Sequence, residues 1–126
     1  MNRKLLTYGK YFFEFYNKLE KDLQEKIDWV FELVKSVDRI PKKYFQHLEN
    51  SDGLFEIRVE FESNIYRIFC FFDEGNLVIL INAFQKKTQK TPKLELELAK
   101  KLKQQYFIDK KLNAENEKGI SKKIKR

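Results

Sequence analysis

The chain has 126 residues, of which 42% are hydrophobic and 15% aromatic, and this composition predicts one folded domain rather than a disordered chain. Charged side chains interrupt every apolar run before the roughly 18–20 residues that a membrane span needs, and no export signal opens the sequence. A cytoplasmic protein with no membrane partner is therefore expected. One cysteine excludes an internal disulfide, one histidine excludes a histidine-rich metal site, and we expect neither a metal nor another cofactor.

Positive charge is concentrated in the C-terminal part of the chain. Residues 1–81 contain 12 Lys and Arg against 14 Asp and Glu, whereas residues 82–126 contain 14 against 5. This asymmetry is typical of a protein that binds a polyanion, most often nucleic acid, although a basic tail can also serve solubility alone.

The N-terminal third reads as a short strand followed by two helices. Residues 3–8 form a candidate strand that ends at Gly9, and residues 10–19 repeat apolar side chains at helical spacing. Residues 22–37 carry a longer apolar stripe of the same period. We expect the two helices to form an antiparallel hairpin that packs on a sheet.

The remaining chain predicts a loop, three strands and a last helix. The loop covers residues 40–53, the strands cover residues 54–61, 65–72 and 77–84, and the helix covers residues 91–107. Together these elements predict an α+β fold: a helical hairpin on one face of a small, mostly antiparallel four-stranded sheet, with a C-terminal helix. We expect one domain over residues 1–109 and a basic, mobile or weakly helical tail over residues 110–126.

Turn lengths predict how the three strands pair. If Glu62 and Ser63 form a two-residue turn, Arg58 lies opposite Arg67. If Glu74 and Gly75 form the next turn, Arg67 lies opposite Asn82. One face of this sheet is apolar throughout and predicts the core. The other is polar at one end and apolar at the other, and we expect a protein partner to cover its apolar end.

Two arginines directly opposite each other repel, so an anion is expected beside them. Glu56 and Glu60 on the same face could neutralise Arg58 and Arg67 in a surface network. Alternatively, the two guanidinium groups bind a phosphate, whose oxygens they grip in pairs. Alternation places Asn82, Phe84 and Lys86 on this face as well, and an exposed Phe84 ring could stack on a base.

The segment AFQKKTQKTP (residues 83–92) joins the last strand to the last helix and carries three lysines. Thr91 and Pro92 are a typical N-cap and first-turn pair, and backbone N–H groups at a helix start favour anions. Lys86, Lys87 and Lys90 would strengthen that field. A plain solvated lysine loop is the alternative interpretation.

These residues resemble the RelE/HigB toxin superfamily, in its phage-derived HigB-like branch. The runs that carry the resemblance are GLFEIRVEFESNIYRIFCFF from Gly53 and LVILINAFQKKTQKTP from Leu77, and it extends over roughly residues 3–107. It implies a RelE-like fold, with two N-terminal helices on one face of a small antiparallel sheet. It also implies a type II toxin: an endoribonuclease that cleaves mRNA on the ribosome and that a cognate antitoxin, of helix-turn-helix type, inhibits.

Metal-independent RNA cleavage by the 2′-hydroxyl needs charge stabilisation at the phosphate, a base and an acid. The resemblance implies a catalytic set of Arg67, Arg58, Lys86 and Lys87, in which a lysine acts as base or acid if neighbouring cations lower its pKa. The candidate substrate-binding residues are Phe84, Asn82, Lys90, Thr88 and Thr91. The chain lacks the C-terminal catalytic histidine or tyrosine of other superfamily members, so the general base stays open.

Two other functions are compatible with the sequence. A ParE-like member of the same superfamily would inhibit a protein target such as gyrase without phosphate chemistry. A plain RNA-binding module would use the basic segment for affinity alone.

Overall fold

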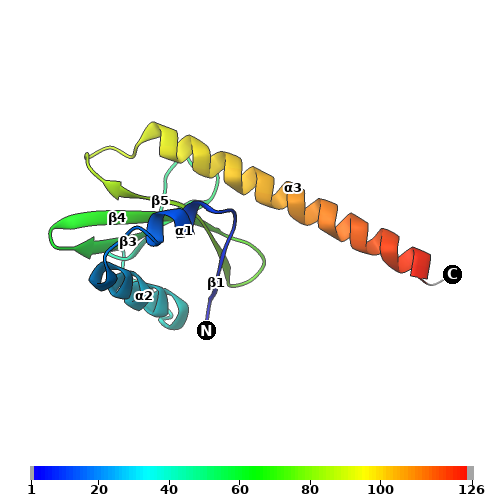
Figure 1. Cartoon of the computed structure of the whole chain (residues 1–126), viewed down its shortest axis with the longest axis horizontal. Helices are drawn as coiled ribbons and strands as arrows, with labels where there is room; N and C mark the ends of the chain where they lie inside the picture. Colours follow the sequence, from blue (N-terminus) through cyan, green and yellow to red (C-terminus); the bar gives the residue numbers. More distant parts are fainter. Residues whose placement is uncertain (1, 125–126) are drawn as a thin grey trace.

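The computed structural model describes the backbone of residues 2–124 and the side chains of residues 2–116. Within this range the chain forms three helices and one five-stranded mixed sheet, an α+β fold as predicted (Figure 1). The elements are β1 (Lys4–Thr7), α1 (Tyr11–Tyr16), α2 (Lys21–Ser36), β2 (Phe45–His47), β3 (Leu54–Phe61), β4 (Asn64–Phe72), β5 (Leu77–Lys86) and α3 (Lys93–Ile124).

The sheet has the strand order β1-β5-β4-β3-β2, with β1 parallel to β5 and the other neighbours antiparallel. The prediction of four strands was wrong, because β2 lies within the stretch expected to be a loop. Its Phe45 pairs with Ile57 of β3. Three residues are too few to show the alternation by which a strand is recognised in a sequence.

The β3–β4 register agrees with the prediction, and Arg58 lies opposite Arg67. The β4–β5 register does not, since Arg67 lies opposite Phe84 rather than Asn82. The Asp73 N–H donates to the carbonyl of Leu77 (2.8 Å), so the turn is one residue longer than predicted. A bulge in β5, between Leu80 and Ala83, then shifts the pairing by one more residue. It sets two residues of β5 opposite one residue of β4.

The helices α1 and α2 cover one face of the sheet, where α1 packs on β5 and α2 packs on β3 and β1. The simple hairpin that we expected is not matched, because the two helices lie over different strands. They still touch, through the rings of Phe12 and Phe31 (5.5 Å between centroids) and the Tyr16–Asp28 hydrogen bond (2.9 Å). Cys70 is buried in this layer, and its burial raises the pKa of the thiol.

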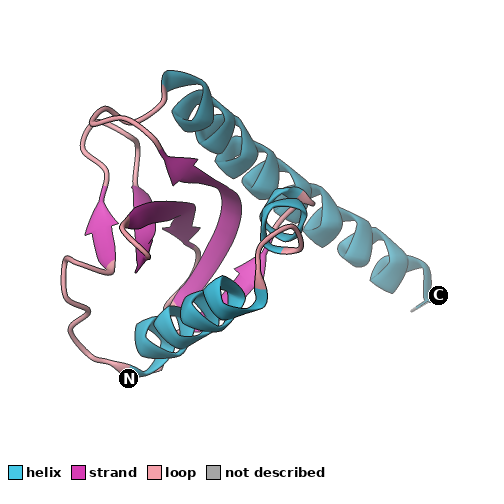
Figure 2. Ribbon diagram, turned by 60° about the vertical axis from the view of Figure 1, so that its left-hand side comes forward, coloured by secondary structure: helices cyan, strands magenta, loops and turns pink. Residues whose placement is uncertain are grey.

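The helix α3 crosses the opposite face of the sheet (Figure 2). Ala99 packs there against a second apolar cluster, whose buried members are Leu54, Phe69, Phe71, Ile79 and Ile81. The expectation that a separate protein covers this apolar end was therefore wrong, since the chain covers it with its own helix. Leu94, at the start of α3, is 80% exposed.

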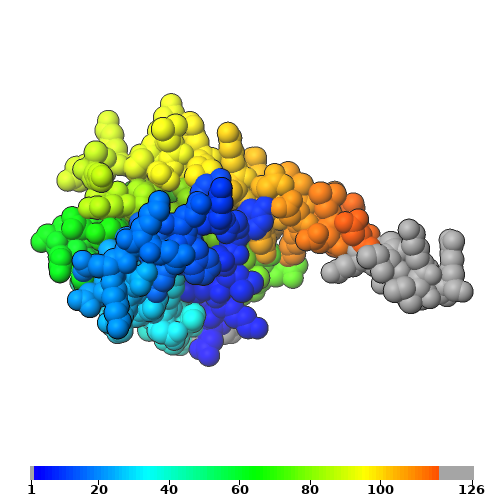
Figure 3. Space-filling view, in the orientation of Figure 1, coloured from blue at the N-terminus to red at the C-terminus, as the bar shows by residue number. Residues whose placement is uncertain are grey.

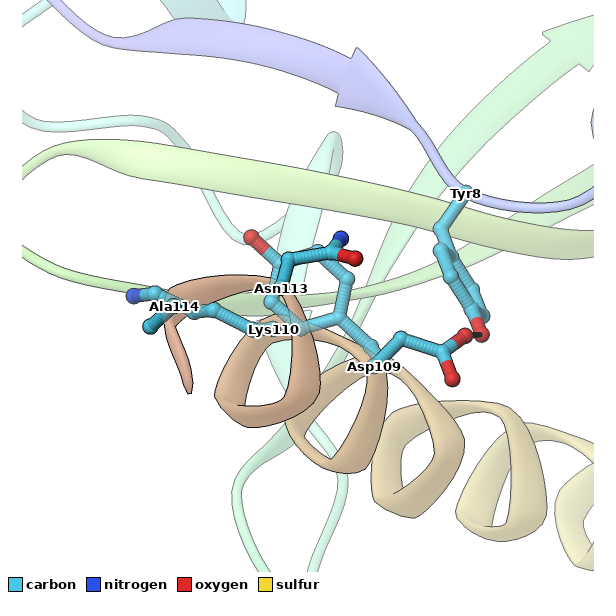
Figure 4. A pocket seen from close by; sticks show the side chains of 6 residues that line it. Tyr8, Asp109, Lys110, Asn113 and Ala114 are labelled. Atoms are coloured by element: carbon cyan, nitrogen blue, oxygen red, sulfur yellow. Dashed lines mark hydrogen bonds between the residues drawn. The ribbon is translucent and has the colours of Figure 1, made fainter. Parts of the chain in front are cut away.

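Side-chain hydrogen bonds of Tyr106, Asp109 and Lys110 anchor α3 around residue 107, where the sequence predicted its end. Asp73, in the turn between β4 and β5, accepts hydrogen bonds from the Tyr106 hydroxyl (2.6 Å) and from Lys110 (2.9 Å). The Tyr8 hydroxyl donates to Asp109, and both residues line a hollow of about 430 Å³ (Figure 4). Burial, reinforced by Asp109, raises the pKa of Tyr8 to about 12.

The expected tail at residues 110–126 begins inside α3, which projects from the body of the molecule in Figure 1. Residues 125–126 and the side chains from 117 onward lie outside the described residues, so a mobile tail stays a prediction. Within residues 2–124, no helix combines the length and hydropathy that crossing a membrane requires.

Candidate functional site

Side chains from three strands meet at the polar end of the sheet face that α3 partly covers. Register places Arg58, Arg67 and Phe84 in one row across β3, β4 and β5. The next row contains Glu60, Ile65 and Lys86. Because alternate residues of a strand share a face, both rows lie on the same side of the sheet.

Arg67 lies deep in this arrangement, only 6% exposed, and its guanidinium group is engaged. Its Nε donates to the carboxylate of Glu56, which is itself 4% exposed, and its Nη1 donates to Thr91 Oγ1 (3.1 Å). The rings of Phe69 and Phe84 flank the guanidinium carbon at 5.7 and 5.8 Å. For Arg67, the structure therefore shows the neutralisation by glutamate that the sequence left as one of two interpretations.

Arg58 is only partly buried, and its guanidinium group forms no ion pair or hydrogen bond with any described residue. Its backbone N–H is used by the sheet, donating to the carbonyl of Tyr44 (2.9 Å). Glu56 neutralises Arg67, and this reduces the repulsion expected between the two arginines. Arg58 thus offers a cation to a ligand without first losing a partner.

The lysine-rich segment borders a hollow of about 310 Å³ at the same end of the sheet. Lys86 lies partly buried at the end of β5, while Lys87 and Lys90 are exposed. The Thr88 hydroxyl donates to the carbonyl of Lys90 (3.0 Å), which tightens the turn. The hollow is lined by Ser63, Asn64, Ile65, Lys86, Lys87, Thr88 and Gln89. Around residues 86–92 the surface protrudes, yellow-green to yellow at the upper left of Figure 3.

The structure brings some of the predicted site residues together and separates others. Lys86, Lys87 and Thr88 line one hollow, while Lys90 is not among its walls. Phe84 packs edge-on against Phe69, 5.2 Å between centroids. Thr91 contacts Arg67.

Asn82 points elsewhere, because the bulge turns it toward α3. Its Nδ2 donates to the backbone carbonyl (3.0 Å) and to Oε1 (3.1 Å) of Glu95. Sequence reasoning missed this partner of Asn82. An acidic residue in the first turn of a helix was the available signal, but it is common to many helices.

A family model now adds to this geometry. The model described as "Phage derived protein Gp49-like (DUF891)" matches residues 14–104. The chain belongs to the Gp49-like family. That family is a RelE/HigB-like toxin family, and the matched range contains every candidate site residue from Arg58 to Thr91. A search of curated proteins gave no match.

Membership of the Gp49-like family agrees with the toxin class to which the sequence was compared, and it implies an antitoxin partner. The match begins after β1 and ends within α3. Strand β1 and the projecting part of α3 therefore lie outside the matched range.

Proposed function

We propose that this protein is the toxin of a type II toxin–antitoxin system, of the HigB-like branch, and that it acts as an mRNA interferase. It cleaves mRNA on the ribosome by metal-independent attack of a 2′-hydroxyl, and a helix-turn-helix antitoxin inhibits it. The observation that carries the proposal concerns Arg58, whose guanidinium group has no partner among the described residues. It lies on the same face and end of the sheet as a hollow lined by Lys86 and Lys87. Three cations at one end of the sheet suit a phosphodiester.

In the proposed reaction, the 2′-oxygen forms a bond to phosphorus while the bond to the 5′-oxygen breaks. The products are a 2′,3′-cyclic phosphate and a free 5′-hydroxyl. Arg58 stabilises the negative charge on the phosphate, Lys86 accepts the proton of the 2′-hydroxyl, and Lys87 supplies a proton to the departing 5′-oxygen. Phe84 stacks on a base, while Lys90 and Thr88 bind flanking phosphates.

We assign Arg67 a supporting part in this site rather than direct contact with the phosphate. Its side chain is engaged by Glu56 and Thr91, so it ties β3, β4 and the start of α3 together beneath the lysine-rich segment. A buried arginine with a full carboxylate partner has little attraction left for a second anion. Its contribution is to hold Phe84 and Thr91 in place.

A second candidate is ParE-like inhibition of a protein target such as gyrase. It is favoured by three large apolar side chains that α3 exposes away from the lysine hollow: Phe107, Ile108 and Leu112. An RNA substrate has no evident use for them.

Inducible expression of the chain, with primer extension on a model transcript, separates the two candidates. The interferase predicts new 5′ ends within the reading frame, which vanish when the start codon is removed. Lys86→Arg and Arg58→Ala should abolish them, while Lys111→Arg on exposed α3 serves as the control. Growth arrest without new 5′ ends would contradict the interferase and favour the protein target.

A further inference from the structure

A third hollow lies on the opposite side of β5 from β4, between α1 and the first turns of α3. Its volume is about 400 Å³, and its polar walls come from Tyr11, Glu14, Lys18, Asn82 and Glu95. The space exists because β1 stops pairing with β5 at Leu80. Past that residue, within the described chain, no strand covers the outer edge of β5.

One residue that lines this hollow, Asn82, has a buried acceptor without a partner among the described residues. Asn82 is 2% exposed, and its Nδ2 is used by Glu95, but its Oδ1 accepts no hydrogen bond from any described residue. A buried carbonyl oxygen without a donor is costly and is rare in folded proteins. A ligand that brings a donor to this position would remove that cost.

The walls define which ligand complements the hollow. Glu14 and Glu95 offer carboxylate acceptors beside the free Oδ1 of Asn82, Lys18 offers one donor, and Tyr11 offers a flat ring. Among the four RNA bases, guanine alone presents two adjacent N–H donor groups, at N1 and N2, next to an acceptor, O6. Single-stranded RNA is commonly read by this combination of stacking and contacts to the Watson–Crick edge.

We infer that this hollow, defined by Glu14, Lys18, Asn82 and Glu95, binds a guanine base of the RNA. The inference rests on the proposed function, and it adds a base preference to the cleavage site. Asn82 precedes Lys86 by four residues on β5, or about 13 Å along a strand. That separation suits a nucleotide close to the scissile phosphate rather than the one being cut.

The test follows the Asn82 side-chain amide signals of ¹⁵N-labelled protein during titration with GMP, AMP, CMP and UMP. Saturable shifts with GMP alone are expected, with affinity at least tenfold weaker in Glu95→Gln and in Glu14→Gln. Glu97→Gln, on the exposed side of α3, is the control and should bind GMP as the wild type does. Because Glu14 is exposed, its variant keeps the test valid if Glu95→Gln does not fold.

Equal shifts with all four nucleotides would overturn the inference, since they would report only phosphate binding to a basic surface. Shifts caused by N-acetyl-arginine amide but not by GMP would also overturn it, and would make the hollow a site for a cationic protein side chain. Guanine binding without any RNA cleavage would support the hollow and refute the proposed function. RNA cleavage by a wild-type protein that binds no GMP would support the proposed function and refute the guanine site.

Discussion

Replacing Arg67 by alanine should destabilise the fold, and the structure gives the size of the effect. The substitution leaves the Glu56 carboxylate, 5% exposed as a side chain, buried without its partner. Breaking a buried ion pair in this way costs about 3–5 kcal/mol, against total stabilities of about 5–15 kcal/mol for a domain. With a urea m-value of about 2 kcal/mol/M, the unfolding midpoint should fall by about 2 M.

Equilibrium urea unfolding, followed by circular dichroism, measures this shift. Arg58→Ala is the matched control, because Arg58 has no side-chain partner among the described residues, and its variant should stay within about 0.5 kcal/mol of the wild type. Arg67→Met combined with Glu56→Leu should recover most of the loss, since an apolar pair leaves no charge buried. An Arg67→Ala protein that unfolds at the wild-type urea concentration would refute the reasoning.

Three further predictions concern chemistry, binding and the anchoring of α3. Lys86→Arg should keep RNA binding but slow single-turnover cleavage about 100-fold or more, because arginine does not exchange protons near neutral pH. Lys90→Arg should leave the cleavage rate nearly unchanged. Equal cleavage rates for Lys86→Arg and wild type would show that another group acts as the general base. Affinity for RNA should fall with salt at a log–log slope of about −0.7 to −0.9 per phosphate contacted, and deleting residues 115–126 should make filter-binding slopes shallower without stopping cleavage. A salt-independent affinity would instead favour a protein target. Burial acts to raise the pKa of Asp73, but hydrogen bonds from Tyr106 and Lys110 outweigh it and hold the pKa below 3.8. Asp73→Asn should therefore lower the urea midpoint at pH 7, with a difference that shrinks as the pH falls below 3.8; a difference independent of pH would contradict this ionic role.

The β3–β4 hairpin could be predicted from the sequence because two independent signals agree on its register. Alternation of polar and apolar residues along β3 sets which face is buried. The short turn at Glu62 and Ser63, both with positive φ (48° and 67°), then fixes the pairing. Arg58 opposite Arg67 follows from these two signals together.

The β4–β5 register could not be predicted in the same way. Both faces of these strands are covered by helices, so Phe69–Phe72 and Val78–Ile81 are continuous apolar runs in which a shift of one residue leaves the pattern unchanged. The longer turn and the bulge leave no mark in the sequence. Because of this register error, the sequence predicted Asn82 rather than Phe84 opposite Arg67.

The partner of Arg67 depended on a contact that no local pattern reveals. Glu56 and a substrate phosphate were both reasonable anions for it. In the free protein the partner is Glu56: the ion pair lies buried, and Thr91, just before α3, carries no charge but accepts a hydrogen bond from the guanidinium group. Helix propensity and apolar periodicity predict that a helix forms, but they do not predict which face of the sheet it packs on.

Single-turnover cleavage of mRNA on programmed ribosomes tests the central claim most directly, with analysis of the product ends and with Arg58→Ala beside the wild type. The wild type should leave 2′,3′-cyclic phosphate and 5′-hydroxyl ends without added metal, and Arg58→Ala should be slower by about 10²-fold or more while remaining folded. Ribosomes that carry intact mRNA at toxin concentrations that stop growth, or an Arg58→Ala protein that cleaves at the wild-type rate, would contradict the proposed mechanism.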